Sequence, residues 1–406
     1  MTETYVIERL GHLGDGIAPG PIYAARCLPG EEIAGDVVEG RIAAPWIVRP
    51  SPDRVKAPCR HYNSCGGCSL LHASDGFVKD WKTDVVRAAL AAHGLAPEFR
   101  ATQTSPAQSR RRAVLSARRG KKGAVIGFHG RKSDAITAVD GCRLLHPDIL
   151  AGLPALSELA QIGASRKGEL SINVVQSTAG LDVTVSNGKP LNRELETNLA
   201  QALHKFGFAR LAWNGEVIAV ETPPVQRFGA VSVVPPSGSF LQATREGENA
   251  LLTAVSDIVG DAKQVVDLFA GCGTFALPLA QTAEIHAVEG AGEMLDALAL
   301  AWRNSRGLKH VTTEVRDLFR NPLMEEDLAR FDAAVIDPPR AGAAAQIETL
   351  AASDVARIAM VSCNAVTFAR DAKALCDAGY DLNWVQVVDQ FRWSTHIEQV
   401  GSFTKS

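Results

Sequence analysis

The stretch VVDLFAGCGTFALPLA, residues 265–280, combines an apolar strand, a glycine-rich turn and the beginning of a helix. Gly271 and Gly273 let a ligand approach the backbone closely, and the helix start offers unpaired N–H groups. The turn differs from the dinucleotide-binding fingerprint because Ala276 stands at the third glycine position. It also lacks the Lys-Ser/Thr pair of a phosphate-binding P-loop. The stretch therefore predicts a nucleotide-like ligand that carries little negative charge.

An acidic residue follows each of the next two predicted strands. Glu289 ends the strand HAVE, where a carboxylate suits the two hydroxyls of a ribose. Asp317 ends EVRD and is placed to accept a hydrogen bond from an adenine amino group. Taken singly, either residue could equally be a surface acid at a helix cap. Together with the turn, the two acids predict an adenosine site without phosphate contacts, which points to S-adenosylmethionine.

The carboxyl-terminal part of the chain alternates apolar runs with helical segments. The runs are VVDLFAG, EIHAVEG, VTTEVRD, FDAAVIDPP and IAMVSCN. Strands that alternate with helices at intervals of roughly 20–25 residues are typical of a parallel sheet covered on both faces. Two further strands follow, in YDLNWVQVVDQF and THIEQVGSF. We therefore predict a doubly wound, Rossmann-like α/β domain over residues 239–406.

The first two-thirds of the chain has a different pattern. Residues 1–52 alternate apolar residues around Gly and Pro turns, which predicts a small β-barrel. The proline-rich segment PWIVRPSPDRVKAP marks the boundary to a mostly β region over residues 53–238, which includes a helical stretch near 77–93. A second boundary lies in RFGAVSVVPPSGSF. We therefore expect three domains: 1–52, 53–238 and 239–406.

Composition places the chain among soluble globular proteins. Of its 406 residues, 46% are hydrophobic and 21% are charged. No apolar run approaches the ~20 residues that cross a bilayer, and the amino terminus lacks the basic and apolar segments of a secretory signal. We therefore expect a cytoplasmic protein without a membrane partner. No obligate protein partner is evident, so we expect a monomer.

A basic run interrupts this nearly neutral chain, whose net charge of −3 gives no case for nucleic-acid binding. SRRRAVLSARRGKK, residues 109–122, holds seven basic residues and no acid. Its alternation suits a strand or hairpin with one basic face. Such a run can be a solvated charged face or a stripe that contacts phosphates. The basic residues are Arg110, Arg111, Arg112, Arg118, Arg119, Lys121 and Lys122.

Three of the eight cysteines are clustered, and clustered cysteines in a cytoplasmic chain suggest a metal site before disulfides. Cys59, Cys65 and Cys68 have C-x₅-C-x₂-C spacing, and Cys142 is available as a fourth ligand. Zinc sites usually use short C-x₂₋₄-C pairs on both halves. The three-plus-one set therefore favours an iron–sulfur cluster over zinc. The remaining cysteines other than Cys363 are expected to be packing residues.

The motifs GSFLQ, DLFAGCGTF, AVEG, DPPRAG, VSCN and HIEQV resemble those of the RNA (uracil-5-)-methyltransferases. The resemblance covers the whole chain and is strongest to the iron–sulfur-containing 23S ribosomal RNA uracil-5-methyltransferases. It implies an OB-like TRAM barrel over 1–52, a central α+β RNA-binding domain with the cluster over 53–238, and a class I methyltransferase domain over 239–406.

The resemblance assigns Cys363, in VSCN, as the nucleophile. A thiolate that adds to carbon 6 of uracil makes carbon 5 reactive toward a methyl group, which is covalent catalysis by a thiol. Carbon 5 must then lose its proton, and the family's base falls on Glu398 in HIEQV. Asn364 is expected to help position the uracil. The target base must leave its stack or lie in a loop to expose a ring face.

The same resemblance implies the contacts of the methyl donor, S-adenosyl-L-methionine. Two departures from the family pattern matter. Thr274 stands where the family commonly has Asn, and residues 391–394 read Phe-Arg-Trp-Ser where the family commonly reads F-P-x-T. Arg392 could contact RNA instead. The expected cofactor contacts are Gln242, Phe269, Thr274, Glu289, Asp317 and Asp337.

The resemblance also matches all four clustered cysteines and implies a 4Fe–4S cluster held by Cys59, Cys65, Cys68 and Cys142. The cluster and the TRAM-like module favour 23S ribosomal RNA as the substrate, because the family's transfer-RNA branch is expected to lack both. A transfer-RNA uridine is the alternative substrate. A noncatalytic RNA-binding or ribosome-assembly factor with the same fold is the alternative function, and intact Cys363 and Glu398 argue against it.

Overall fold

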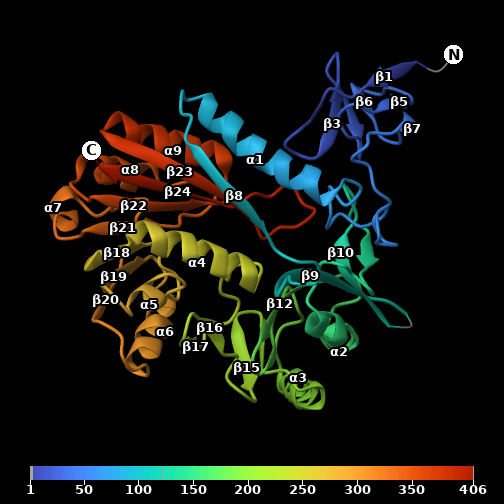
Figure 1. Cartoon of the computed structure of the whole chain (residues 1–406). Coiled ribbons are helices and arrows are strands. Elements are labelled where there is room, and N and C mark those ends of the chain that lie inside the picture. Colours follow the sequence, from blue (N-terminus) through green and yellow to red (C-terminus); the bar gives the residue numbers. More distant parts are fainter. Residues whose placement is uncertain (1–2, 122, 406) are drawn as a thin grey trace.

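An eight-stranded sheet forms the carboxyl-terminal half of the molecule in the computed structural model, which describes residues 3–121 and 123–405 (Figure 1). Its strand order is β20-β19-β18-β21-β22-β24-β23-β8. The strands are β8 (Glu98–Thr104), β18 (Gln264–Leu268), β19 (Glu284–Glu289), β20 (Val311–Val315), β21 (Ala333–Ile336), β22 (Arg357–Ser362), β23 (Tyr380–Asp389) and β24 (Gln399–Lys405).

Helices cover both faces of this sheet. Successive strand residues face opposite sides, so Val265 packs with one set of helices and Val266 with the other. One face carries α4 (Arg245–Val259), α5 (Ala276–Leu279) and α6 (Gly292–Arg303). The other carries α1 (Asp75–Ala91), α7 (Glu325–Leu328), α8 (Ala344–Ala352) and α9 (Ala365–Asp377). Burial on both faces explains the continuous apolar runs and confirms the predicted doubly wound fold.

Helix α1 and strand β8 join this sheet although they lie within the segment 53–238. Strand β8 pairs in parallel with β23, from Glu98 opposite Trp384 to Thr104 opposite Asp389. Lys82 of α1 is fully buried and its Nζ lies 2.6 Å from Oδ1 of Asp389. The chain thus crosses to the carboxyl-terminal sheet and returns before the central sheet is built. The three-domain division stays a prediction.

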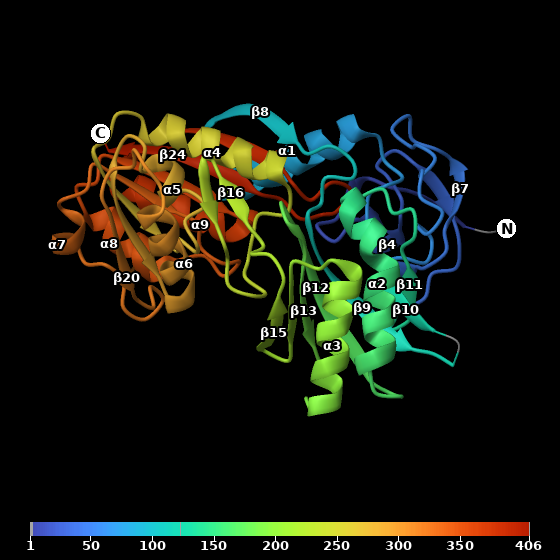
Figure 2. The same cartoon turned by 90° about the horizontal axis from the view of Figure 1, so that it is seen from below.

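The central region is a seven-stranded sheet in the order β11-β10-β9-β12-β13-β14-β15. Helices α2 (Pro147–Gly163) and α3 (Arg193–Phe206) lie side by side on one face of it (Figure 2). The strands are β9 (Arg112–Arg119), β10 (Ala124–His129), β11 (Ile136–Ala138), β12 (Glu169–Ser177), β13 (Gly180–Ser186), β14 (Arg210–Trp213) and β15 (Glu216–Val220). A two-stranded sheet, β16 (Gln226–Phe228) and β17 (Val231–Val233), leads to α4.

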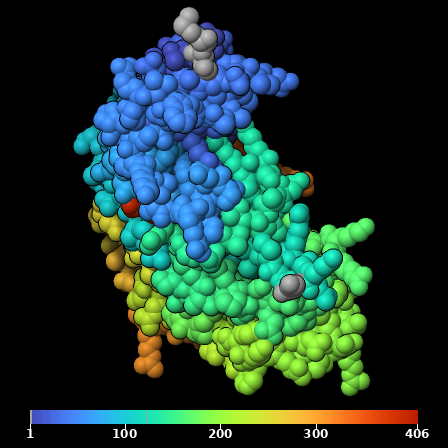
Figure 3. Space-filling model, turned by 90° about the vertical axis from the view of Figure 1, so that its right-hand side faces the viewer, coloured from blue at the N-terminus to red at the C-terminus, as the bar shows by residue number. Residues whose placement is uncertain are grey.

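Two small sheets, β1-β5-β7 and β2-β3-β4-β6, form the amino-terminal module. They enclose an apolar core that includes Ile7, Ile33 and Cys27, which is fully buried. Figure 3 shows this module, in blue, packed on the central region. The strands are β1 (Thr4–Val6), β2 (Arg9–Leu10), β3 (Asp15–Ala18), β4 (Ile22–Ala25), β5 (Glu32–Ala34), β6 (Arg41–Ile42) and β7 (Trp46–Arg49).

The basic run of residues 109–122 forms strand β9 and its approaches, as its alternation indicates. One residue departs from the expectation of a basic face. Arg111 is buried and forms an ion pair with Glu248 of α4, so it joins the two sheets. Arg118 and Arg119 are exposed, although Arg118 pairs with Glu169. Lys122 lies outside the described residues.

In residues 3–121 and 123–405, none of the helices has both the length and the apolar character needed to span a bilayer.

Candidate active site

Three residues predicted from the sequence meet where strands of the large sheet end. Ser362, the last residue of β22, pairs with Gln399, the first residue of the antiparallel β24. Cys363 and Glu398 are the next residues on these two neighbouring strands, so they lie at the same edge. Asp337 directly follows β21, the other neighbour of β22. We call Cys363, Glu398 and Asp337 the strand-end site.

The thiol at this site lies among carboxyl groups. Burial raises the pKa of Cys363 to about 11, and the charges of Glu398 and Asp337 act in the same direction. Arg340, in the D-P-P-R segment, partly opposes them. Cys363 is half-buried. Without a substrate the thiol form therefore dominates at neutral pH, and a proton acceptor must lie near when it reacts.

Glu398 is buried and Asp337 is half-buried, and both carboxyl groups hold their protons unusually strongly. Burial raises the pKa of Asp337 to about 7. Burial also raises the pKa of Glu398 well above its ordinary value, and the charge of Asp337 raises it further. Two neighbouring acids in a dry site resist ionising together. The site therefore has a carboxyl group that can exchange a proton near neutral pH.

Two glutamines connect these carboxyl groups. Gln390 Nε2 lies 3.0 Å from Glu398 Oε2 and 2.6 Å from Gln242 Oε1. Gln242 Nε2 lies 3.3 Å from Asp337 Oδ2. Gln242 was a predicted cofactor contact, whereas Gln390 was missed. Its sequence context gives no signal, because only the pairing of β23 with β24 brings residue 390 back beside residue 398.

Asn364 links the strand-end site to the D-P-P-R segment. Its side-chain oxygen accepts a hydrogen bond from Val366 N–H and caps α9. Its Nδ2 donates to the carbonyl oxygen of Arg340 at 3.1 Å. The side chain predicted to position uracil therefore holds the start of α9 to the D-P-P-R segment.

The glycine-rich turn after β18 lies beside this edge. Phe269, Gly271 and Gly273 all adopt positive φ angles, of 63°, 56° and 92°. A side chain at 273 would clash with Leu277 and Leu298, which lie 2.8–2.9 Å from its Cβ position. The tight turn thus explains the glycine at 273.

Glu289 connects the turn with the end of β19. Its Oε2 accepts a hydrogen bond from Gly271 N–H at 3.1 Å, and its Oε1 accepts one from Ala291 N–H at 3.0 Å. The predicted ribose-binding carboxylate is thus held at the mouth of the turn by two backbone donors. Thr274, where the family commonly has Asn, lies half-buried in the same turn.

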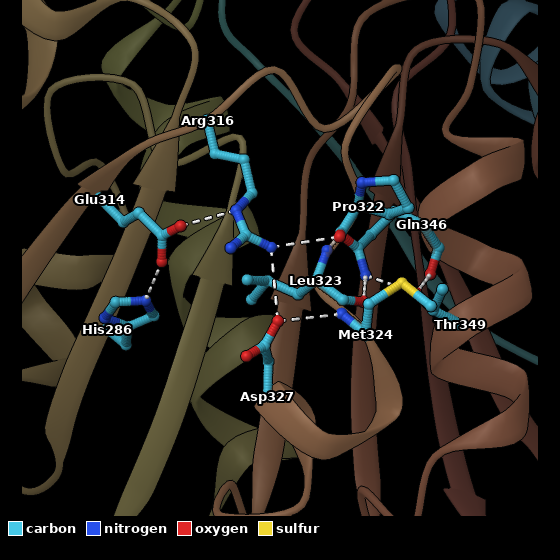
Figure 4. Close-up of polar contacts among 9 residues, drawn as sticks. All are labelled: His286, Glu314, Arg316, Pro322, Leu323, Met324, Asp327, Gln346 and Thr349. Carbon is cyan, nitrogen blue, oxygen red and sulfur yellow. Dashed lines mark hydrogen bonds and ion pairs between the residues drawn. The ribbon is translucent and has the colours of Figure 1, made fainter.

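Asp317 begins a loop that is held by the side chain before it. Arg316 pairs with Glu314 and Asp327 and donates to the carbonyl oxygen of Pro322 (Figure 4). Asp317 Oδ1 accepts from Phe319 N–H at 3.0 Å, and the ring of Phe319 lies 5.4 Å from that of Phe269. The ring of Phe319 therefore lies beside the turn residue Phe269, in the loop that begins at Asp317.

Asp267 is a further buried acid that sequence reasoning missed. Its Oδ2 accepts a hydrogen bond from Ala276 N–H at 2.9 Å and fixes the turn to the helix that follows. Its Oδ1 is buried without a hydrogen-bond partner among the described residues. Burial and the charge of Asp337 raise its pKa well above the ordinary value. Its position inside an apolar strand was the available signal.

The residues around the turn fit S-adenosyl-L-methionine. Glu289 and Asp317 supply hydrogen-bond acceptors for hydroxyl and amino groups, and Phe269 supplies an aromatic face. The turn, residues 269–275, contains no Lys or Arg, as suits a ligand without phosphate. Asp337 is half-buried at the end of β21, and the positive charge of a sulfonium beside it would favour its ionised form.

All four cysteines of the predicted metal site line one cavity, which we call the cysteine cavity. The loop of residues 59–68 supplies Cys59, Cys65 and Cys68, and Cys142 comes from the turn before α2. All four thiols are free of disulfides. The rest of the lining is His61, Tyr62, Gly67, Leu71, Phe128, Val139, Arg143 and Leu144. The fold thus brings together residues that are more than 70 positions apart in sequence.

The four thiols around the cysteine cavity are ligands of the kind that hold a metal centre. Burial raises the pKa of Cys68 to about 12, and it raises the pKa of Cys65 and of Cys142. Across residues 3–121 and 123–405, no three Cys, His, Asp or Glu side chains are arranged to hold a metal ion. Zinc would need its thiolates at about 2.3 Å from one centre. Four cysteine thiolates are the ligands of a 4Fe–4S cluster and also of structural zinc sites, so the residues of the cysteine cavity suit both groups.

Comparisons with known proteins agree with this geometry. Residues 235–405 match the family model tRNA (Uracil-5-)-methyltransferase. An uncharacterized RNA methyltransferase of Rhizobium meliloti is 42% identical over 100% of both chains. The 23S rRNA (uracil(1939)-C(5))-methyltransferase RlmD of Nitrosococcus oceani is 32% identical over 98% of this chain and 95% of its own.

One solved structure shares the fold from end to end. The tRNA (uracil-54, C5)-methyltransferase of Pyrococcus abyssi has a TM-score of 0.77, with 22% identity, over 99% of both chains. The likeness extends over the amino-terminal module as well as the two sheets, and it is a likeness of fold. The full-length identities nevertheless settle the family. The chain belongs to the S-adenosyl-L-methionine-dependent RNA (uracil-5-)-methyltransferases.

Proposed function

We propose that this enzyme methylates carbon 5 of a uridine in 23S ribosomal RNA through a covalent bond between Cys363 and the uracil. The observation that carries the proposal is the register of β22 and β24, which puts a thiol and a buried carboxyl group at one sheet edge. Bound S-adenosyl-L-methionine supplies an electrophilic methyl group. Its contacts are the six expected residues at the turn and strand ends: Gln242, Phe269, Thr274, Glu289, Asp317 and Asp337.

The Cys363 thiol gives its proton to the Asp337 carboxylate as Sγ forms a bond to carbon 6 of uracil. The electron pair of the carbon 5–carbon 6 double bond then becomes available at carbon 5. Once carbon 5 carries the methyl group, Glu398 accepts the proton that is still bound to carbon 5. The electron pair of that C–H bond restores the double bond, and the bond from carbon 6 to Sγ breaks. A base for this step needs a pKa near the working pH, and burial moves the pKa of Glu398 in that direction.

Paired cations and aromatic rings around the strand-end site support an RNA substrate. Arg112 lies 4.6 Å from the ring centre of Phe240, which is 56% exposed and two residues before Gln242. Arg110 lies 5.7 Å from the ring centre of Phe391. Exposed aromatic faces beside arginines suit unstacked bases and their phosphates.

A 4Fe–4S cluster bound by Cys59, Cys65, Cys68 and Cys142 completes the proposal. Its binding requires deprotonated thiols. Arg110, whose charge lowers the pKa of Cys68 and Cys142, helps their thiolates to form. The cluster fastens the loop of residues 59–68 to the turn before α2. We assign it a structural role in the RNA-binding region, without redox work.

Ribosomal RNA is favoured by the RlmD relative, which matches nearly the full chain, and transfer RNA is the alternative. The purified enzyme should transfer labelled methyl groups to unmodified 23S rRNA and not to unmodified transfer RNA. Digestion to nucleosides then identifies 5-methyluridine. If the label appeared in transfer RNA and not in 23S rRNA, the substrate assignment would be reversed. Cys363→Ala, which retains the fold, serves as the control for label that does not depend on the thiol.

A further inference from the structure

We infer that Gln390 is a positioning residue for the base Glu398, and that it connects the base to the methyl-donor side of the site. The inference rests on the proposed function, because it concerns proton removal from carbon 5. The side-chain amide of Gln390 is buried, which is unusual for a polar group: the residue is 1% exposed and directly follows the last residue of β23.

Backbone contacts fix which way this amide points. Gln390 Oε1 accepts a hydrogen bond from Ala243 N–H at 2.7 Å. Its NH₂ group must then point to the other side, where it reaches Glu398 Oε2 at 3.0 Å and Gln242 Oε1 at 2.6 Å. All hydrogen-bond partners of the Gln390 amide are thus defined. Its NH₂ group holds the carboxyl group of Glu398, and it cannot turn away unless the hydrogen bond between Gln390 Oε1 and Ala243 N–H is broken.

The same contacts set the direction of the second amide. Gln242 Oε1 accepts from Gln390, so its NH₂ group faces Asp337 Oδ2 at 3.3 Å. A continuous chain therefore runs from Asp337 through Gln242 and Gln390 to Glu398. It joins the carboxyl group on the donor side to the base on the uracil side. Movement at either end changes the hydrogen bonds at the other.

The neighbouring elements are shaped to keep Gln390 in place. A Cβ atom at Gly247 of α4 would lie 2.6 Å from Gln390 Cβ, so the helix leaves room for this side chain. The backbone closes the other side: Val388 N–H donates to Glu398 C=O at 2.8 Å, and Gln390 N–H donates to Val388 C=O at 3.0 Å. Lys82 pairs with Asp389, the preceding residue, and fixes it to α1.

This arrangement assigns Gln390 one step of the reaction. With its NH₂ group on Oε2, Glu398 is held so that its carboxylate meets the proton on carbon 5. When that proton moves to Glu398, its electron pair forms the carbon 5–carbon 6 double bond, and the pair of the carbon 6–sulfur bond returns to Cys363. Formation of the covalent bond comes earlier and does not use Gln390.

Gln390→Met tests the inference, because methionine keeps the length of the side chain and removes its hydrogen bonds. With uridine RNA and the methyl donor, we expect turnover to fall at least about tenfold and the methylated covalent adduct to accumulate. With 5-fluorouridine RNA, where no proton can be removed, the adduct should form at the wild-type rate. Both signals are read on denaturing gels with labelled methyl groups.

Gln226→Met is the matched control. Gln226 is also a buried glutamine, 1% exposed, and its Nε2 donates to Gln176 C=O in the β16–β17 region. The Gln226→Met variant should methylate RNA at the wild-type rate and accumulate no adduct. Wild-type adduct levels and turnover in Gln390→Met would overturn the inference, as would slower adduct formation on 5-fluorouridine RNA. A wild-type enzyme that forms no adduct at all would instead overturn the covalent route.

Discussion

The strand-end site and the cysteine cavity both bury thiols, but they surround them with different neighbours. Around Cys363 the neighbours are carboxyl groups, Glu398 and Asp337, which can exchange protons. Around Cys68 they are three other thiols, and apolar side chains such as Leu71 and Phe128 complete the lining. Burial raises the pKa in both places. The neighbours therefore decide whether a buried thiol is suited to attack carbon or to bind metal.

The largest expected effect separates the two regions by activity. Cys363→Ala should reduce methylation about a thousandfold or more, because no other group at the site replaces a covalent nucleophile. The melting temperature should stay close to that of the wild type, since the residue is half-buried and the substitution removes a single sulfur atom. Transfer of a radiolabelled methyl group measures the methylation activity, and thermal unfolding measures the melting temperature. Substantial activity in this variant would remove the thiol from the mechanism.

Glu398→Gln tests the carboxyl side of the same site. Loss of a general base typically costs 10²–10⁴-fold, and here the methylated adduct should accumulate because carbon 5 keeps its proton. Denaturing gels of the quenched reaction show the adduct as a slowly migrating band. Free, unmethylated RNA with no adduct would mean that Glu398 acts before methyl transfer, contrary to the assignment.

The raised pKa of Cys363 predicts how its reactivity depends on pH. With a pKa of about 11, the thiolate fraction rises tenfold per pH unit below that value. Alkylation of Cys363 by iodoacetamide, followed by mass spectrometry of the peptide, should accelerate about tenfold per unit between pH 7 and pH 9. Cys376, half-buried and outside both regions, is an internal comparison. A rate at Cys363 that levels off below pH 8 would show an activated thiol instead.

The smallest effect on chemistry is expected at the cysteine cavity. Cys68→Ser should lose iron and lower the melting temperature by several degrees, because metal binding contributes to folding. Methylation by the protein that stays folded should fall less than tenfold. Iron assay and calorimetry are the measurements, on protein purified without oxygen. A thousandfold loss of activity with an unchanged melting temperature would give the cavity a catalytic role.

Much of this comparison was predictable from the sequence. The periodic apolar runs predicted the doubly wound sheet, and Glu289 was singled out because it ends one of its strands. The roles of Cys363 and Asp337 come from the family resemblance and stay predictions. The four cysteines could be grouped by spacing and resemblance, and the fold brings them to one cavity.

The sequence could not provide contacts that depend on long-range pairing. Gln390 is an ordinary polar residue until β23 lies beside β24. Arg111 looked like part of a basic surface, yet it is buried against Glu248, which comes from the distant helix α4. Helix α1 and strand β8 looked like parts of the central region, and only tertiary structure adds them to the large sheet. Local patterns identify elements, but they do not specify which distant element covers them.

Trapping with 5-fluorouridine RNA tests the central claim most directly. Wild-type enzyme, the methyl donor and the RNA substrate should give a stable covalent complex, because fluorine on carbon 5 cannot leave as a proton. Protease digestion and mass spectrometry should place the nucleotide on Cys363, with one added methyl group. A complex attached at another cysteine, or methylated RNA released without any complex, would contradict the account.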